Sequence, residues 1–364
     1  MTTESRRTAM SRGAGLIASP LFAGLITAVA ENSGKQKPPI KVGQIGVGHG
    51  HASKLSVYRQ SADYEVVGIA EPDERLREKA RSLEVYQGLS WMTPEQLLNV
   101  PGLQAVLVET RVGDLLDSAQ ACVEAGLHVH LDKPAGASFP QYRRILETAT
   151  AKNLWVQMGY MYRYNPAIVL LREVLRQGWL GEVFEVHAVM SKVVSPTDRQ
   201  PLAQFRGGMM FELGCHLIDL VIGLLGAPSK VSPFLRHSSS TINDGLLDNT
   251  LAVFEYPHAL ASVKSSALEV GGFDRRHLVV CGTEGTFHIQ PLDSPSARVC
   301  FSTDRGPYPS GYQDVPFPKF TRYEADAADM ARVIRGEKPI DYPPEHDLAV
   351  QAALLQACDM PLGF

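Results

Sequence analysis

One stretch near the start of the globular part of the chain limits what the rest can be. Residues 40–51 read I-K-V-G-Q-I-G-V-G-H-G-H, an apolar strand pattern that runs into a cluster of glycines, and residues 52–58 can continue as a helix. Gly46 permits a tight turn, Gly48 lets the backbone approach a phosphate, and the free N–H groups of a helix start attract an anion. His51 stands where a third glycine is usual. The turn therefore predicts a phosphate site, although such turns also occur where no ligand binds.

Composition and charge narrow the class of protein. A chain of 364 residues exceeds the size at which one core stops growing, about 250–300 residues, so two domains are expected. The formal net charge of −4 and the lack of a long basic run argue against nucleic-acid binding. The five cysteines form no C-x-x-C pair and are odd in number, so neither a disulfide framework nor a structural zinc site is expected.

Residues 1–30 have the pattern of an export signal. They contain Ser-Arg-Arg at positions 5–7, an apolar stretch broken by Pro20, and the small-residue motif A-V-A at 28–30. The start resembles a twin-arginine signal, which predicts a protein exported to the periplasm in folded form. The alternatives are a cytoplasmic protein whose true start is Met10, or an uncleaved N-terminal anchor. Residues 31–39 read as a flexible linker, and no stable membrane insertion is expected after processing.

Strands alternate with helices through residues 40–158. This pattern predicts a parallel, doubly wound sheet. The expected strands after the first are 64–70, 104–110, 127–131 and 154–158, and the expected helices are 74–81, 114–125 and 141–152. Ligands of such sheets bind outside the carboxyl ends of the strands. Lys133 directly follows one strand, in Asp132-Lys133-Pro134, and is therefore the first candidate for chemistry.

An acid follows the second expected strand. Glu71 lies about twenty residues beyond the glycine turn, where dinucleotide sites place a carboxylate for the adenosine ribose. A carboxylate there accepts hydrogen bonds from both ribose hydroxyls and repels a 2′-phosphate, which favours NAD over NADP. The alternative is an acid that only faces the N-terminus of the next helix.

Residues 159–364 are expected to form a second domain rich in β-structure. Short strands separated by turn residues predict a mostly antiparallel sheet. The expected strands are 182–194, 251–256, 259–269, 277–282 and 285–289, the expected helices are 167–176, 320–335 and 344–358, and the Pro- and Gly-rich stretch 302–318 is expected to be loop. Within this half, Glu212 and His216 are four residues apart on an expected helix, so they should share a face and form an acid/base pair.

Five motifs in this order resemble the Gfo/Idh/MocA oxidoreductases, which include glucose–fructose oxidoreductase and inositol dehydrogenase. The resemblance spans about residues 41–355. Its motifs are the glycine turn, the acid Glu71, Asp132-Lys133-Pro134, Arg163-Tyr164-Asn165-Pro166, and a Gly-Gly…Glu212…His216…Asp219 helix. The resemblance implies an N-terminal NAD(P)-binding domain and a C-terminal α/β domain, whose open sheet serves substrate binding and association into a dimer or tetramer. It also implies a catalytic triad of Lys133, Glu212 and His216.

The chain departs from the family pattern at several positions. The usual E-K-P reads D-K-P, and the usual aspartate of the helix motif is Glu212, one methylene longer. The T-P-N-x-x-H stretch reads T-R-V-G-D-L at residues 110–115, and Met209 replaces the third glycine before the helix. Two H-x-H pairs, His49/His51 and His128/His130, could hold a metal, but no third ligand has matching spacing, so no metal is expected.

Taken together, the residues and the resemblance predict a cofactor-binding set and a function. The expected cofactor contacts are Gly46, Gly48, His49, Gly50, His51, Glu71, Thr110, Asp132, Lys133 and Arg163. The expected activity is NAD-dependent hydride transfer from a hydroxyl of a sugar, sugar acid or cyclitol. Two alternatives stay open: a glycosidase that retains NAD and oxidises a ring carbon transiently, and a non-catalytic sensor of sugar or nucleotide.

Overall fold

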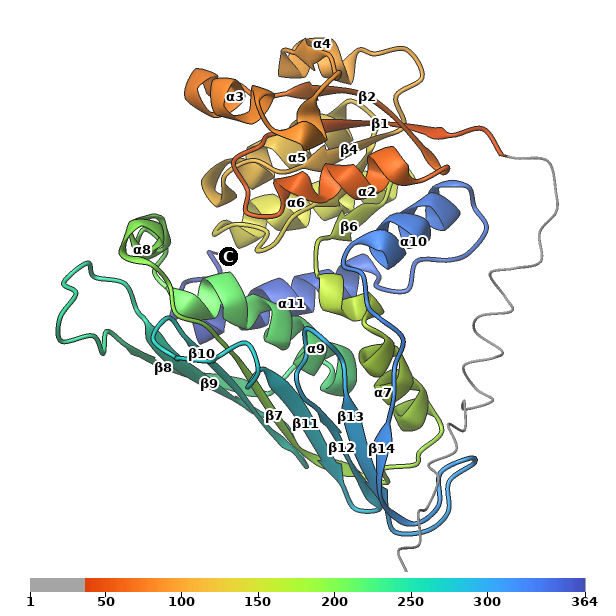
Figure 1. Ribbon diagram of the computed structural model, residues 1–364, viewed down its shortest axis with the longest axis vertical. Coiled ribbons are helices and arrows are strands. Elements are labelled where there is room, and N and C mark those ends of the chain that lie inside the picture. The colour runs from red at the N-terminus through yellow and green to blue at the C-terminus, as the bar shows by residue number, and fades with distance from the viewer. Residues whose placement is uncertain (1–36, 364) are drawn as a thin grey trace, which may run out of the picture.

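The computed structural model describes residues 37–363, which fold around two β-sheets (Figure 1). The expected export signal and residues 31–36 of the linker lie outside the described residues. Within residues 37–363, no helix has both the length and the apolar character needed to cross a membrane.

The first sheet has six parallel strands in the order β3-β2-β1-β4-β5-β6. Helices cover both of its faces, so the central strands are largely buried on both sides; residues Ala105–Val108 are all apolar, whereas Ile40–Ile45 also contains Lys41 and Gln44. The predicted doubly wound parallel sheet is confirmed. Its strands are β1 (Ile40–Ile45), β2 (Tyr64–Ala70), β3 (Trp91–Met92), β4 (Ala105–Val108), β5 (His128–Leu131) and β6 (Val156–Met158), and its helices are α2 (Leu55–Gln60), α3 (Glu74–Arg81), α4 (Pro94–Leu98), α5 (Leu115–Glu124) and α6 (Phe139–Ala151).

Two helices near the C-terminus return to this first sheet (Figure 1). Helix α10 (Glu324–Ile334) packs Ala327 and Met330 into a buried cluster with Leu55 of α2. The phenol of Tyr64 on β2 donates a hydrogen bond of 2.6 Å to the Ala327 carbonyl. Helix α11 (Pro344–Ala357) packs against α6. Two helices from late in the chain, α10 and α11, therefore pack against the first domain.

The second sheet has eight strands in the order β14-β13-β12-β11-β7-β10-β9-β8. Only β7 and β10 run parallel, and the other neighbours are antiparallel, which confirms the predicted mostly antiparallel sheet. Its strands are β7 (Val183–Ser191), β8 (Lys230–Arg236), β9 (Asn249–Glu255), β10 (Leu260–Ser266), β11 (His277–Gly282), β12 (Gly285–Ile289), β13 (Ala297–Phe301) and β14 (Gly311–Val315). The prediction of loop throughout 302–318 is wrong, because β14 pairs with β13 there.

Helices cover one face of the second sheet, between it and the first (Figure 1). Helix α9 (Cys215–Leu225) lies on β7 and β10 and also packs against α11. Its first eight residues, Cys215–Ile222, are all buried, although His216 and Asp219 interrupt the apolar sequence. Helices α7 (Pro166–Arg176) and α8 (Pro196–Ala203) belong to the same half of the chain. The start of α9 therefore points at the carboxyl ends of the first sheet.

Candidate active site

The glycine turn lies against the residues that follow β4. Gly46 has a positive φ of 91°, and a Cβ added to it would lie 2.4 Å from the Thr110 backbone nitrogen. Only glycine fits there. The structure thus brings Thr110 beside the turn, at the same edge as Asp132 and Lys133 after β5.

The turn keeps backbone donors free for an anion. Among residues 37–363, the N–H groups of Gly48 and Gly50 have no hydrogen-bond partner, and a Cβ on Gly50 would meet nothing within 4 Å. Glu71, at the end of β2, accepts hydrogen bonds of 2.8 Å from Val47 N and Asp73 N. The acid therefore lies directly beside the turn. These features fit a dinucleotide, with free N–H groups for its phosphates and a carboxylate for its ribose.

A buried lysine that the sequence analysis did not single out forms the centre of the site. The Lys54 ammonium lies 2.7 Å from Asp132 Oδ2, 3.1 Å from Glu109 Oε1 and 2.9 Å from His130 Nε2. All three partners are buried. Burial alone would lower the pKa of Lys54, but the two carboxylates outweigh it and raise the pKa above its usual value. Lys54 is therefore a permanent cation beneath the glycine turn.

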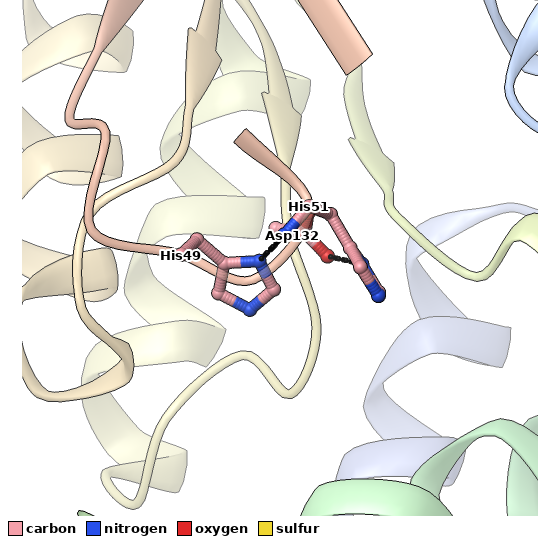
Figure 2. Close-up of side chains that lie close together, drawn as sticks. All are labelled: His49, His51 and Asp132. Carbon is pink, nitrogen blue, oxygen red and sulfur yellow. Dashed lines mark hydrogen bonds and ion pairs between the residues drawn. The ribbon is translucent and has the colours of Figure 1, made fainter. Parts of the chain in front are cut away.

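His49 and His51 lie on either side of the Asp132 carboxylate (Figure 2). His49 Nδ1 is 3.1 Å from Asp132 Oδ2, and His51 Nδ1 is 3.2 Å from Asp132 Oδ1. The other ring nitrogen of His49, Nε2, lies 3.0 Å from the Lys133 carbonyl oxygen. Asp132 is thus the third donor group that the H-x-H spacing did not reveal, since it comes from a different strand. A divalent ion on these donors would meet repulsion from the Lys54 ammonium, which already contacts the same carboxylate.

Lys133 and Glu212 meet across the two domains. Lys133 Nζ lies 3.1 Å from the Glu212 carbonyl oxygen and 3.2 Å from its Oε1. The lysine side chain is buried, whereas the glutamate remains 23% exposed. Burial lowers the pKa of Lys133, but the nearby Glu212 carboxylate more than compensates and raises it. The Glu212 carboxylate therefore favours the ammonium form of Lys133 at the junction of the two domains.

Glu212 and His216 do not form the pair that their spacing suggested. Residues Met210–Gly214 form a π-helical turn, and the α-helix begins only at Cys215. The Glu212 carboxylate turns to Lys133, while the His216 ring lies between Tyr160 and Tyr162, with centroids 6.0 and 5.3 Å away. The His216 Nδ1 atom is buried without a hydrogen-bond partner among the described residues. The α-helical geometry assumed for this pair is therefore wrong.

Arg163 lies away from the glycine turn. Its guanidinium contacts Asp219 Oδ1 at 2.6 Å and Asp347 Oδ1 at 2.5 Å, and all three side chains are buried. It also stacks over the rings of Tyr160 and Tyr342. The expected cofactor contact of Arg163 has no support in this geometry, because the guanidinium joins α9 to α11 inside the second domain.

Burial lowers the pKa of two imidazoles near Lys133, those of His51 and His216. It lowers the pKa of His51 to about 4, and Lys133 and Lys54 add to the effect although Asp132 opposes it. Burial also lowers the pKa of His216 well below its usual value, again with help from Lys133. A neutral imidazole can take up a proton, so both rings are chemically able to act as bases.

Sequence reasoning missed three residues of the site, Lys54, Glu109 and Tyr323, and it considered His130 only as half of a metal pair that it rejected. The Tyr323 ring lies 5.8 Å from that of His51 and 5.0 Å from Lys54 Nζ. Its approach depends on α10 packing back on the first sheet, which no local pattern reveals. Glu109 could have been found, since it ends a buried strand just as Asp132 does.

Two family models cover most of the described chain. Residues 40–160 match the oxidoreductase family with an NAD-binding Rossmann fold, and residues 168–288 match the Gfo/Idh/MocA C-terminal domain. The chain belongs to the Gfo/Idh/MocA family. It is accordingly an NAD(P)-dependent oxidoreductase.

Relatives within the family are distant. The trans-1,2-dihydrobenzene-1,2-diol dehydrogenase of Mus musculus is 25% identical over 243 residues, 66% of this chain and 70% of its own. The myo-inositol 2-dehydrogenase of Thermotoga maritima is 24% identical over 257 residues, 68% and 74% of the two chains. A solved structure of the UDP-N-acetylglucosamine 3-dehydrogenase GnnA from Acidithiobacillus ferrooxidans superposes with a TM-score of 0.72 at 20% identity, over 90% of this chain and 99% of that one. Because the sequence identity to this solved structure is only 20%, the similarity shows a shared fold and nothing more specific.

Proposed function

We propose that this protein is an NAD-dependent dehydrogenase that oxidises a ring hydroxyl of a sugar, sugar acid or cyclitol. The observation that carries the proposal is the buried Lys133 ammonium, held at the end of β5 by Glu212 from the other domain. An ammonium in a water-poor cleft stabilises an alkoxide as it develops, because charge interactions are stronger there than in water. Lys133 would hold the substrate oxygen, and a neutral imidazole of the cleft would take the proton.

The chain's own residues support NAD as the cofactor. Bound NAD⁺ would supply the hydride acceptor. The free N–H groups of Gly48 and Gly50 would hold its phosphates, with Thr110, His49 and Asp132 at the same edge. Glu71 favours NAD over NADP, since its buried carboxylate would repel a 2′-phosphate.

Two distant relatives support the substrate class. One is named for a trans-diol and the other for myo-inositol. Both of these compounds carry hydroxyl groups on a six-membered carbon ring. The several polar groups between the domains suit a substrate with more than one hydroxyl, since each can fix its orientation.

Further expectations from the sequence also stand as proposals. We infer export of the folded protein by a twin-arginine route, from residues 1–30.

We also infer that copies associate through the face of the second sheet that no described helix covers, where Phe234, Leu260 and Tyr312 are exposed (Figure 1). Light scattering during gel filtration tests this association. A protein that is monomeric at micromolar concentration would rule the association out.

The activity is tested by NADH formation with a panel of myo-inositol, D-glucose, D-gluconate and trans-1,2-cyclohexanediol. We expect absorbance at 340 nm to rise with at least one of them, and no turnover with any would overturn the proposal. Lys133→Met should abolish turnover but retain NAD binding, while Lys319→Met, at an exposed position, should behave as wild type. Cleavage of p-nitrophenyl glycosides without added cofactor would instead indicate the glycosidase.

A further inference from the structure

Three histidines lie close together on the face of the second sheet that no described helix covers (Figure 1). His187 is on β7, His277 on β11 and His288 on β12, which are neighbouring strands. His187 and His288 both lie opposite Val279 of β11. His277 is two residues before Val279, so the alternation of side chains along a strand puts all three rings on one face. Leu278 points the other way, into the core.

The spacing of these rings is close to that of histidines that share a metal ion. The ring centroids of His187 and His277 are 5.2 Å apart, and those of His277 and His288 are 6.0 Å apart. Zinc lies about 2.0–2.1 Å from each imidazole nitrogen, so the centroids of two rings that share a tetrahedral ion are about 5 Å apart. The first pair therefore has the separation that a shared ion requires, and the second pair is slightly wider.

Hydrogen bonds hold two of the rings by Nδ1 and leave Nε2 free. His277 Nδ1 donates to the Arg275 carbonyl oxygen, 2.9 Å away, so its Nε2 carries a lone pair. His187 Nδ1 lies 2.6 Å from the Ser262 hydroxyl oxygen. Within residues 37–363 neither Nε2 has a hydrogen-bond partner. A histidine that binds a metal through one nitrogen is usually held in this way by the other.

His288 is the ring that has to move. Its side chain is partly buried and forms no hydrogen bond to the described part of the chain, so the ring is free to turn. As the three rings stand, their nitrogens are not all within 4.8 Å of one another, so binding requires this turn toward His277.

Arginines beside the three rings already have carboxylate partners. Arg275, just before β11, is paired with Glu269, and Arg298, directly opposite the third histidine, is paired with Asp314. An ion here would therefore not face an unpaired guanidinium.

We propose that His187, His277 and His288 bind a divalent transition-metal ion of the zinc class through their Nε2 atoms. Imidazole nitrogens suit zinc, cobalt, nickel and copper, whereas calcium and magnesium require oxygen donors. Three imidazoles leave the fourth tetrahedral position for a water molecule. No spacing in the sequence reveals this site, because its ligands come from three strands and none belongs to an H-x-H pair.

The test is calorimetric titration of chelator-treated, tag-free protein with ZnCl₂, without substrate or dinucleotide. We expect wild type to bind one ion per chain. His277→Ala removes the central ligand and should weaken zinc affinity roughly 100-fold or more. His288→Ala should also weaken it, and because this ring has no hydrogen bond, the variant should unfold in urea as wild type does. The matched control is His258→Ala, at an exposed position, which should bind zinc as wild type does.

Titration with CoCl₂ gives a spectroscopic readout of the same site. Tetrahedral cobalt absorbs visible light, so a band should appear with wild type and with His258→Ala but not with His277→Ala.

Each outcome decides the assignment. One zinc ion per chain, bound weakly by both ligand variants and normally by the control, supports the site. No stoichiometric binding by wild type, or full binding by both ligand variants, overturns it. Zinc binding that His49→Ala abolishes and His277→Ala retains also overturns it, in favour of an ion on His49, His51 and Asp132. None of these measurements uses a substrate, so their result is separate from that of the NADH assay.

Discussion

Lys133 Nζ lies within 3.1–3.2 Å of two Glu212 atoms, the backbone carbonyl oxygen and Oε1. The lysine lies just after β5 of the first sheet, and the glutamate lies in the π-helical turn before α9, so this contact joins the first domain to the second. The Glu212 carboxylate raises the pKa of Lys133, so in the proposed reaction the ammonium would be in position before a substrate arrives.

Removing the charge of Glu212 should shift the alkaline side of the pH–rate profile. The Glu212 carboxylate raises the pKa of Lys133, and burial alone would lower it. The active form is the ammonium, present below the pKa of Lys133 and lost as pH rises through it. In Glu212→Gln this pKa falls, so activity should be lost at a pH lower by about one unit or more. The measurement is kcat between pH 7 and 11.

Glu212→Asp is the matched control for that experiment. It keeps the negative charge and restores the residue usual in the family. The pH at which Glu212→Asp loses activity on the alkaline side should therefore be closer to the wild-type value than that of Glu212→Gln. If kcat falls at the same alkaline pH in wild type and in both variants, Glu212 does not set the pKa of Lys133.

Glu71 should decide between the two dinucleotides. Glu71→Gln removes a charged acceptor that would bind the ribose and repel a 2′-phosphate. We expect the Kd for NAD to rise about tenfold, equivalent to about 1.4 kcal/mol, and the preference over NADP to shrink. Calorimetric titration with NAD and with NADP measures the two Kd values. The control is Glu74→Gln, because Glu74 is an exposed acid three residues further along the chain. An unchanged ratio of the two Kd values would contradict the ribose role.

The first sheet was predictable because its signals are local. The strands are marked by short runs rich in apolar residues, such as Ala105–Val108, and Gly46, whose φ is 91°, directly follows β1. Lys133 was also found from position alone, since residues after parallel strands meet at one edge of the sheet.

The surroundings of Lys133 were not predictable, for physical reasons that differ by residue. In the sequence, Lys54 looks like a solvent-exposed residue on a helix. Its burial depends on ion pairs with Glu109 and Asp132, which follow two other strands. The π-helical turn at 210–214 changes where Glu212 points, and a pattern of spacing carries no sign of it. Strand β14 lacks an apolar run of its own, because it is an edge strand defined by pairing with β13.

Arg163 should prove structural. Arg163→Met leaves the buried carboxylates of Asp219 and Asp347 without a cation, which should lower the free energy of unfolding by roughly 3–5 kcal/mol. Urea unfolding measures the loss. Arg176→Met is the control, since its partner Glu173 is reached at the surface and the change should cost less than about 1 kcal/mol. If Arg163→Met instead keeps its stability and loses NAD affinity, the guanidinium contacts the cofactor after all.

Asp326, at the start of α10, should make the protein less stable as pH rises. It is buried, its carboxylate oxygens have no hydrogen-bond partner among the described residues, and burial raises its pKa to about 7. Below its unfolded pKa the group is neutral in both states and costs nothing. Between that value and about 7 the unfolded chain ionises while the folded one does not, so the penalty grows with pH and is complete above about 7.

Asp326→Asn removes this penalty at every pH. Its stability relative to wild type should therefore increase by roughly 2–3 kcal/mol between pH 5 and pH 8, from about 1.4 kcal/mol per pKa unit. The unpartnered amide of the asparagine has its own cost, but that cost is the same at both pH values and cancels in the comparison. Urea unfolding of both proteins at pH 5 and pH 8 gives the difference, and Glu324→Gln, exposed on the same helix, should show none. An equal effect at the two pH values would mean that Asp326 is ionised in the folded protein at pH 5, with a partner or solvent contact that stabilises its charge.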